Sequence, residues 1–221
     1  MATLFISDLH LEEARPEIGE QFLDFLAGPA READALYILG DLFEAWIGDD
    51  DPSQYYAGMK QAIRTLVDSG VPVFFMHGNR DFMIGRRFAE ETGVTLLQDP
   101  YPVELFGTNV LLSHGDSLCT DDVEYQQVRA MTRNPEWQAM MLTKSVEERL
   151  AFAQQARAQS MARGEGLDLE ITDVNHGAVE AMIREHGCDV LLHGHTHRPA
   201  VHPLHVDGRP VHRIVLGDWY D

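Results

Sequence analysis

Short apolar runs, each followed at once by polar residues, recur along this chain. Five runs rich in Val, Ile, Leu and Phe are typical of buried strands: Thr3–Ser7, Ala35–Leu39, Val71–Met76, Val110–Ser113 and Asp189–His193. Helix-like stretches lie between them, at Gly19–Leu26, Tyr56–Ser69 and Gly85–Thr92. The alternation of strand and helix predicts an α/β fold, in which a sheet packs on helices.

The end of the chain has a different pattern. In Val201–Trp219, His, Val and Pro alternate around Asp207-Gly208, a pair of residues that favours a tight hairpin turn. This pattern predicts an antiparallel β segment that completes the fold.

Residues 121–166 interrupt the strand and helix alternation. Asn134-Pro135 is typical of a helix start, and Ser145-Val-Glu-Glu148 matches a capping box. We expect three successive helices with no strand between them, forming a cap inserted at residues 121–166 of a single domain that spans residues 1–221. Between residues 122 and 165 six basic residues balance six acidic ones, and the cap holds Trp137, Phe152 and four of the nine methionines.

Each of the five strand-like runs is followed by residues of the types that can bind metals. The endings are Ser7-Asp8-Leu9-His10, Leu39-Gly40-Asp41, His77-Gly78-Asn79-Arg80-Asp81, Ser113-His114-Gly115-Asp116 and His193-Gly194-His195-Thr196-His197. Loops at the carboxyl ends of strands in an α/β sheet converge on one crevice. We therefore expect one dinuclear metal site formed by Asp8, His10, Asp41, Asn79, His114, His195 and His197.

The chemistry of this ligand set narrows the choice of metal. Imidazole, carboxylate and amide oxygen together suit manganese, iron or zinc, and the lack of a thiolate argues against a structural zinc site. Seven ligands suffice for two ions if one carboxylate bridges them, and Asp41 is the natural bridge. Any single ending also occurs as an ordinary turn. The recurrence of five such endings, each directly after a buried strand, favours a common site.

Length and charge exclude several classes of protein. A chain of 221 residues suits one domain with a small insertion, and its net charge of −19 argues against nucleic-acid binding. No apolar run reaches the roughly 18 residues that span a bilayer, and the start, Met1-Ala2-Thr3-Leu4, lacks the basic region of a signal peptide. We expect a cytoplasmic protein, or one attached to a membrane only at its surface.

With these motifs in place, a family resemblance can be stated. The five endings resemble those of the calcineurin-like metallophosphoesterase superfamily. Phe43–Asp51, Asp81–Gly85 and His114–Asp122 resemble one branch closely, the bacterial UDP-2,3-diacylglucosamine diphosphatases of lipid A synthesis. The resemblance covers nearly the whole chain. It implies two packed β-sheets flanked by helices, with a helical cap.

The resemblance also implies an activity, cleavage of the pyrophosphate of UDP-2,3-diacylglucosamine to UMP and the acylated sugar 1-phosphate, lipid X. It implies two manganese ions, one held by Asp8, His10, Asp41 and His197 and the other by Asp41, Asn79, His114 and His195. Catalytic roles would fall to Asp41, Asn79, Arg80 and His195. Substrate contacts would come from Asn79, Arg80, Asp122, Tyr125, Arg157, Ser160 and His195. The enzyme would act peripherally at the cytoplasmic face of the inner membrane, with no protein partner implied.

Two departures from the related sequences matter. Arg80 stands where many superfamily members carry a histidine that protonates the leaving group. An arginine donates no proton readily but grips a phosphate. Because a phosphate leaving group needs no acid, the change favours a pyrophosphate substrate. Gly164 and Leu167 replace an asparagine and a lysine that relatives usually carry, which puts polar contacts to the sugar or acyl amide in doubt.

Two other functions compete with this hypothesis. One is a general dinuclear metallophosphoesterase that acts on soluble nucleotides or phosphodiesters. Arg80 and the apolar cap argue against this function. The other is a non-catalytic scaffold that keeps the fold. The intact set of ligands argues against the scaffold.

Overall fold

The computed structural model describes residues 2–164 and 171–219, which build two β-sheets. The first sheet is parallel, in the order β1 (Thr3–Ile6), β2 (Ala35–Ile38), β3 (Val73–Met76), β4 (Thr95–Leu97). The second has the order β5 (Tyr101–Leu105), β6 (Thr108–Ser113), β7 (Val190–His193), β9 (Arg209–Val215), β8 (Ala200–Val206). In the second sheet β6, β7 and β9 are parallel, and the edge strands β5 and β8 are antiparallel to their neighbours.

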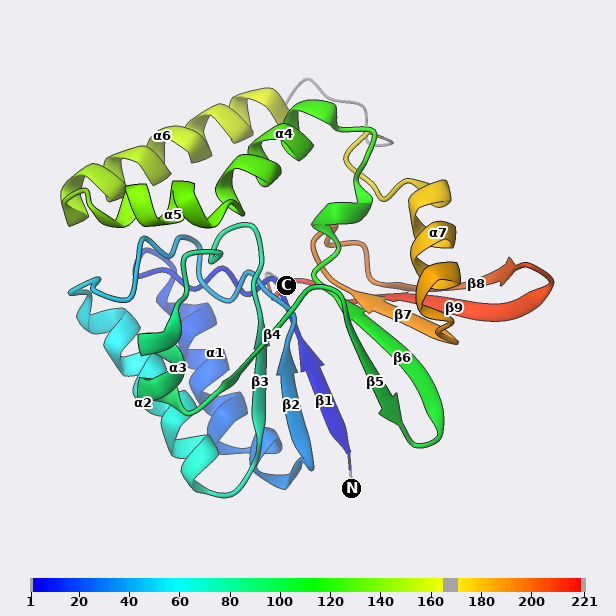
Figure 1. The fold of residues 1–221 in the computed structure, drawn as a ribbon. Coiled ribbons are helices and arrows are strands. Elements are labelled where there is room, and N and C mark those ends of the chain that lie inside the picture. The colour runs from blue at the N-terminus through cyan, green and yellow to red at the C-terminus, as the bar shows by residue number, and fades with distance from the viewer. Residues whose placement is uncertain (1, 165–170, 220–221) are drawn as a thin grey trace.

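The two sheets face each other, and helices cover their outer faces (Figure 1). Helices α1 (Pro16–Ala27), α2 (Gln54–Asp68) and α3 (Arg86–Thr92) pack on the first sheet, and α7 (His176–His186) packs on the second. A third apolar cluster fills the space between the sheets, with Tyr37 and Met76 from one side and Leu112 and Leu192 from the other. This arrangement confirms the expected sandwich of two sheets flanked by helices.

The apolar runs are continuous because both faces of the strands are buried. Along β1, Leu4 and Ile6 belong to the cluster under the helices, whereas Phe5 belongs to the cluster between the sheets. Successive side chains of a strand point to opposite faces, so a strand buried on both faces has no polar positions. The sequence pattern therefore lacks the alternation of a half-exposed strand.

Strand register brings the polar endings together. Ile6 pairs with Ile38 in the first sheet, so the residues after β1 and β2 lie at the same sheet edge. Ser113 pairs with His193 in the second sheet, which aligns the residues after β6 and β7 in the same way. The five predicted strands are all present, but they are divided between two sheets. The predicted hairpin at Asp207-Gly208 is also present, between β8 and β9.

Three helices follow one another without an intervening strand, as expected. They are α4 (Val123–Thr132), α5 (Pro135–Leu142) and α6 (Val146–Gly164), here called the cap, and they form a layer above the strand ends (Figure 1). Asn134 caps α5, and the Ser145 hydroxyl accepts from the Glu148 N–H as the capping box predicts. The division into one domain with an insertion at 121–166 stays a prediction, and residues 165–166, like Leu167, lie outside the described residues.

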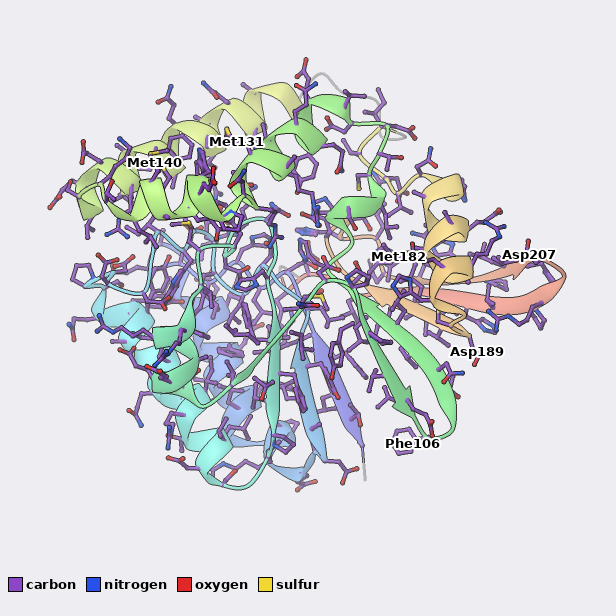
Figure 2. The ribbon with its side chains drawn as sticks, in the orientation of Figure 1. Phe106, Met131, Met140, Met182, Asp189 and Asp207 are labelled. Carbon is purple, nitrogen blue, oxygen red and sulfur yellow. The ribbon has the colours of Figure 1, made fainter. Side chains whose placement is uncertain are left out.

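No helix in the described part of the chain combines the length and hydropathy needed to cross a bilayer. The cap helices nevertheless carry the exposed methionines Met131 and Met140 (Figure 2).

Candidate dinuclear metal site

The predicted metal ligands share an unusual backbone conformation. Five of the seven have positive φ angles: Asp8 (58°), His10 (50°), Asp41 (52°), His195 (68°) and His197 (53°). Among the other described residues that are not glycine, only Phe106 and Asp207 have positive φ angles, and both lie in hairpin turns. Residues with a Cβ rarely adopt this region, and such strain is concentrated at functional sites.

The side chains form two neighbouring groups. Asp8, His10 and His197 make one group, and Asp41, His114 and His195 make the other; within each group one possible ligand atom per residue lies within 4.8 Å of the others. Asn79 joins the second group, because its Oδ1 lies 3.0 Å from His114 Nε2. All seven predicted ligands therefore lie in two clusters, although they come from five loops and both sheets.

Asp41 lies between the two groups. Its Oδ2 is 3.8 Å from His10 Nε2, and its Oδ1 is 3.8 Å from His114 Nε2. The carboxylate is buried, and Oδ1 also accepts a 2.8 Å hydrogen bond from the Arg80 N–H. One oxygen directed at each group is the arrangement that a carboxylate bridging two ions requires.

The orientations of buried polar atoms fit a cation. His114 Nδ1 lies 2.8 Å from the Leu39 carbonyl oxygen, an acceptor, so Nδ1 carries a proton, and Nε2 lies 3.0 Å from Asn79 Oδ1. Burial opposes the charged form of this ring, but the charges of Asp41 and Asp116 raise the pKa of His114 to about 9. Asp8 Oδ1 is buried and lies 3.4 Å from His197 Nε2, while its Oδ2 accepts from the His195 N–H at 2.9 Å. A cation bound here would replace the protons on the Nε2 atoms that face these oxygens and would supply the same charge.

The pKa values of two ligands favour the forms that bind metals. Burial, assisted by the charge of His114, lowers the pKa of His195 to about 4, so its imidazole is neutral near pH 7. Burial would raise the pKa of Asp8, but a hydrogen bond from His197 and the charges of His114 and His197 outweigh it and hold that pKa below its usual range. Neutral imidazole and ionised carboxylate are the forms that ligate metals.

The loop that carries Asn79 is fixed on both sides of Gly78. The Gly78 N–H donates to Asp81 Oδ1 at 2.7 Å, and the Gly78 carbonyl accepts from Arg133 Nη2 at 3.0 Å. Asp81 Oδ2 also accepts from the Leu42 N–H at 2.8 Å, which joins this loop to the loop of Asp41. A Cβ at Gly78 would collide with the Asp41 carboxylate, so only glycine fits there.

Arg133 is the C-cap residue of cap helix α4, so this contact connects the cap to the metal site. The same Nη2 atom is 3.6 Å from Oδ2 of the fully buried Asp116. Asp116 also accepts a hydrogen bond from the Tyr125 hydroxyl at 3.0 Å and lies 2.9 Å from Arg129 Nε, so two residues of α4 and its C-cap residue converge on it.

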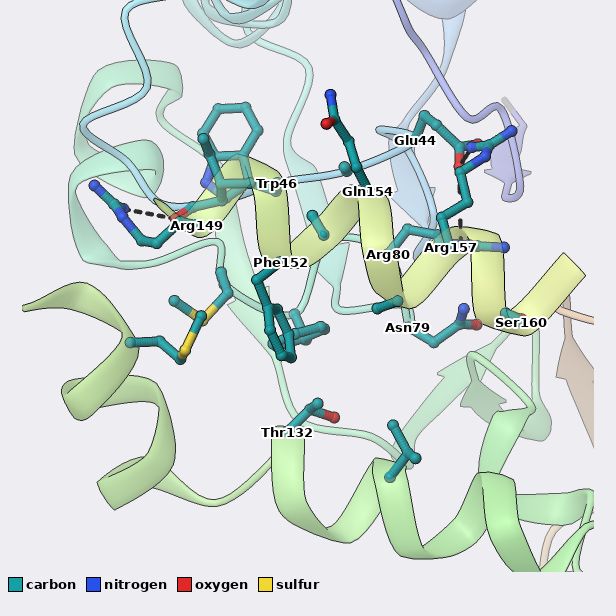
Figure 3. Close-up of a pocket in the computed structure, with 18 of the residues that line it drawn as sticks. Glu44, Trp46, Asn79, Arg80, Thr132, Arg149, Phe152, Gln154, Arg157 and Ser160 are labelled. Atoms are coloured by element: carbon teal, nitrogen blue, oxygen red, sulfur yellow. Dashed lines mark hydrogen bonds and ion pairs between the residues drawn. The ribbon is translucent and has the colours of Figure 1, made fainter. Parts of the chain in front are cut away.

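The site opens into two cavities that differ in character. An apolar cavity of about 720 Å³ lies between the cap and the core and is lined by residues that include Trp46, Phe82, Met141, Leu150 and Phe152. A polar cavity of about 490 Å³ contains His10, Asp41, His195 and His197. Both cavities are lined by Glu44, Asn79, Arg80 and Arg157. In Figure 3, Trp46 and Arg149 lie at one end of the apolar cavity, and Asn79, Arg80 and Arg157 lie at the other.

Most of the predicted substrate-binding residues line these cavities. Asn79, Arg80 and Arg157 line both, Tyr125 and Ser160 line the apolar cavity, and His195 lines the polar one. Asp122 is different, because it is not among the described residues that line either cavity. Its side chain accepts from the Tyr125 N–H at 2.9 Å and caps the start of α4.

Several residues of the site were not singled out from the sequence. Glu44 is buried and pairs with Arg157, and its carboxylate oxygens lie 3.9 Å from nitrogens of Arg15 and Arg80. Buried Arg149 of the cap forms two hydrogen bonds with Asp50 and one with the Ile47 carbonyl. Asp81 and Arg198 directly follow predicted site residues, and Glu44 lies in the Phe43–Asp51 segment, so each has a usable sequence signal. Arg133 and Arg149 have no such signal.

The chain is similar to known proteins over most of its length. A family model described as calcineurin-like phosphoesterase matches residues 1–199. The chain is 54% identical to a UDP-2,3-diacylglucosamine hydrolase of Stenotrophomonas maltophilia and 56% identical to one of Salmonella arizonae; each alignment covers 100% of this chain and 92% of the relative. Among solved structures, vacuolar protein sorting 29 of Cryptosporidium parvum aligns with 98% of this chain and 73% of its own, with a TM-score of 0.48 and 18% identity.

Proposed function

The chain belongs to the calcineurin-like phosphoesterase family, and we propose that it hydrolyses the pyrophosphate of UDP-2,3-diacylglucosamine to UMP and 2,3-diacylglucosamine 1-phosphate, a step of lipid A synthesis. The relatives that match over the full length of this chain carry the name of this hydrolase. The family and the two clusters of ligands make the reaction metal-dependent.

One observation carries the choice of substrate. The apolar cavity under the cap and the polar cavity of the metal ligands meet at Asn79, Arg80 and Arg157. A substrate that fills both must join a large apolar part to an anionic part, with the bond to be cleaved near the junction. A diacylated sugar nucleotide has this build, whereas a soluble phosphodiester leaves the apolar cavity unused.

Divalent ions held by the predicted ligands would supply a nucleophile by lowering the pKa of water and would neutralise phosphoryl oxygens. We assign one ion to Asp8, His10, Asp41 and His197 and the other to Asp41, Asn79, His114 and His195. Arg80 lies where both cavities meet, and its planar guanidinium neutralises the phosphate that departs. Its backbone N–H meanwhile holds the Asp41 carboxylate in the bridging orientation. Manganese fits the mixed oxygen and nitrogen ligands.

The cap also supports contact with a membrane surface. Val123 (62%), Met140 (45%) and Leu142 (50%) are substantially exposed on its helices, and residues 122–165 carry no net charge on a chain of −19. An uncharged, partly apolar layer approaches anionic lipid with less repulsion than the acidic body does. We place the protein peripherally at the cytoplasmic face of the inner membrane.

A comparison of two substrates tests the proposal. Manganese-loaded protein should convert UDP-2,3-diacylglucosamine to UMP and the acylated sugar 1-phosphate. The kcat/KM for UDP-glucosamine without acyl chains should be at least about a hundredfold lower, because burial of each methylene contributes about 0.8 kcal/mol. Equal kcat/KM values would instead support a general phosphoesterase. No hydrolysis by protein that has bound manganese would favour a scaffold.

A further inference from the structure

We infer that the polar cavity is a subsite for the nucleotide half of the substrate, with Arg198 as its principal anion-binding residue. This inference rests on the proposed function, because it assigns the part of the substrate that the apolar cavity does not take. The cavity of about 490 Å³ lies in the size range of small-ligand pockets.

The charge of the cavity wall points to an anionic ligand. Four arginines line it, Arg15, Arg80, Arg157 and Arg198, against the acidic residues Asp41 and Glu44. The whole chain has the opposite balance, with 17 basic and 36 acidic residues. Such a concentration of guanidinium groups beside candidate metal ligands suits a phosphate ester.

Arg198 is held in a fixed position beside the metal ligands. Its Nη1 lies 2.7 Å from Asp173 Oδ2, and its Nη2 donates to Thr172 Oγ1 at 3.2 Å. It directly follows His197, so its guanidinium is attached to the same short loop as a predicted ligand. A guanidinium already oriented by a carboxylate and a hydroxyl loses little conformational entropy when it binds a phosphate.

The two cavities divide an amphiphilic sugar nucleotide at its pyrophosphate. Trp46, Leu150 and Phe152 give the cavity under the cap an apolar wall that suits acyl chains. The polar cavity offers Thr172 and Thr196 hydroxyls together with the arginines, and these groups match a ribose, a pyrimidine and a phosphate. UMP is therefore the product expected to bind there, and the acylated product binds under the cap.

Binding of each product to separate variants tests this assignment. Isothermal titration of manganese-loaded protein with UMP should show about tenfold or more weaker binding to Arg198→Gln, because a charge-assisted hydrogen bond is lost. The Kd of that variant for 2,3-diacylglucosamine 1-phosphate should stay within about twofold of wild type. Phe152→Ala, in the apolar cavity, should give the reverse result, and Arg184→Gln, an exposed arginine paired with Asp207, should change neither.

Arg198 is next to a predicted metal ligand, so Arg198→Gln could also weaken UMP binding by disturbing the metal site. A second variant separates the two effects. Thr172→Val removes a contact of Arg198 without changing charge, and it should weaken UMP binding about threefold at unchanged manganese content. Wild-type protein that hydrolyses the lipid substrate but binds UMP no better than Arg198→Gln and Thr172→Val would overturn the subsite. Failure of wild type to hydrolyse that substrate would instead overturn the proposed function.

Discussion

His10 and His197 present their Nε2 atoms to each other at a distance of 3.4 Å. On the far side of the rings, His197 Nδ1 lies 3.0 Å from Asp218 Oδ2, and His10 Nδ1 lies 3.3 Å from Glu44 Oε2. Carboxylates in these places favour a proton on each Nδ1. A metal ion bound here would take the place of any proton on the facing Nε2 atoms, so that both rings direct Nε2 at the cation.

Asp218→Asn should therefore weaken metal binding. The amide no longer stabilises a proton on His197 Nδ1 by its charge, and partners of metal-bound histidines contribute about 10- to 100-fold to affinity. Titration with Mn²⁺ should show this loss. Asp207→Asn, which alters a carboxylate paired with Arg184 on the surface, serves as the control. Equal manganese affinity of wild type and Asp218→Asn would disprove the role of Asp218.

Asp41→Ala should reduce turnover by about 1000-fold or more, because Asp41 extends one oxygen toward each cluster and the two ions would lose their common ligand. The measurement is kcat at saturating manganese, with thermal unfolding as a check of the fold. Asp189→Asn, a surface carboxylate near Arg209, should retain wild-type turnover. Substantial activity of Asp41→Ala would contradict the bridging assignment.

Arg80→Ala should lower kcat about 100-fold and leave manganese affinity unchanged, since the guanidinium stabilises the departing phosphate but is not a ligand. Arg80→Lys should recover part of the loss, because it restores the charge but not the planar pair of donors. Steady-state kinetics of both variants separate the two contributions. A kcat of Arg80→Ala equal to that of wild type would remove Arg80 from the mechanism.

Arg133→Ala should lower kcat and weaken the binding of one of the two manganese ions. The Gly78 carbonyl loses the donor that lies 3.0 Å away, so the loop that carries Asn79 is held less firmly. Arg129→Ala is the matched control. Arg129 is on α4, which Arg133 caps, and approaches Asp116 at 2.9 Å, but no contact of it with the Asn79 loop is present among the described residues. Manganese titration should distinguish the two variants. Identical titration curves for the two variants would show that Arg133 only holds the cap against the core and does not support the metal site.

The local pattern of the sequence was enough to predict the strand endings, and the seven residues proposed as ligands lie together in the structure. Each ending is contiguous in sequence, and a buried strand followed by a polar turn has a recognisable composition. The support for the ligands could not be predicted in this way. Arg133 and Asp218 reach Gly78 and His197 across the fold, so only the tertiary structure brings them together.

Two further differences have physical reasons. β4 (Thr95–Leu97) is only three residues long, too short for a distinct periodic pattern, and it was not predicted. Asp122, predicted as a substrate contact, stands at the start of α4, where an aspartate is also a favoured N-cap. Sequence alone does not separate these two roles.

Diffraction from crystals grown with Mn²⁺, measured at the manganese absorption edge, tests the central claim most directly. Two anomalous peaks about 3.5–4 Å apart, on either side of the Asp41 carboxylate, are predicted. One should lie among Asp8, His10 and His197, and the other among Asn79, His114 and His195. A single peak, or peaks away from Asp41 in protein that still hydrolyses the substrate, would contradict the account.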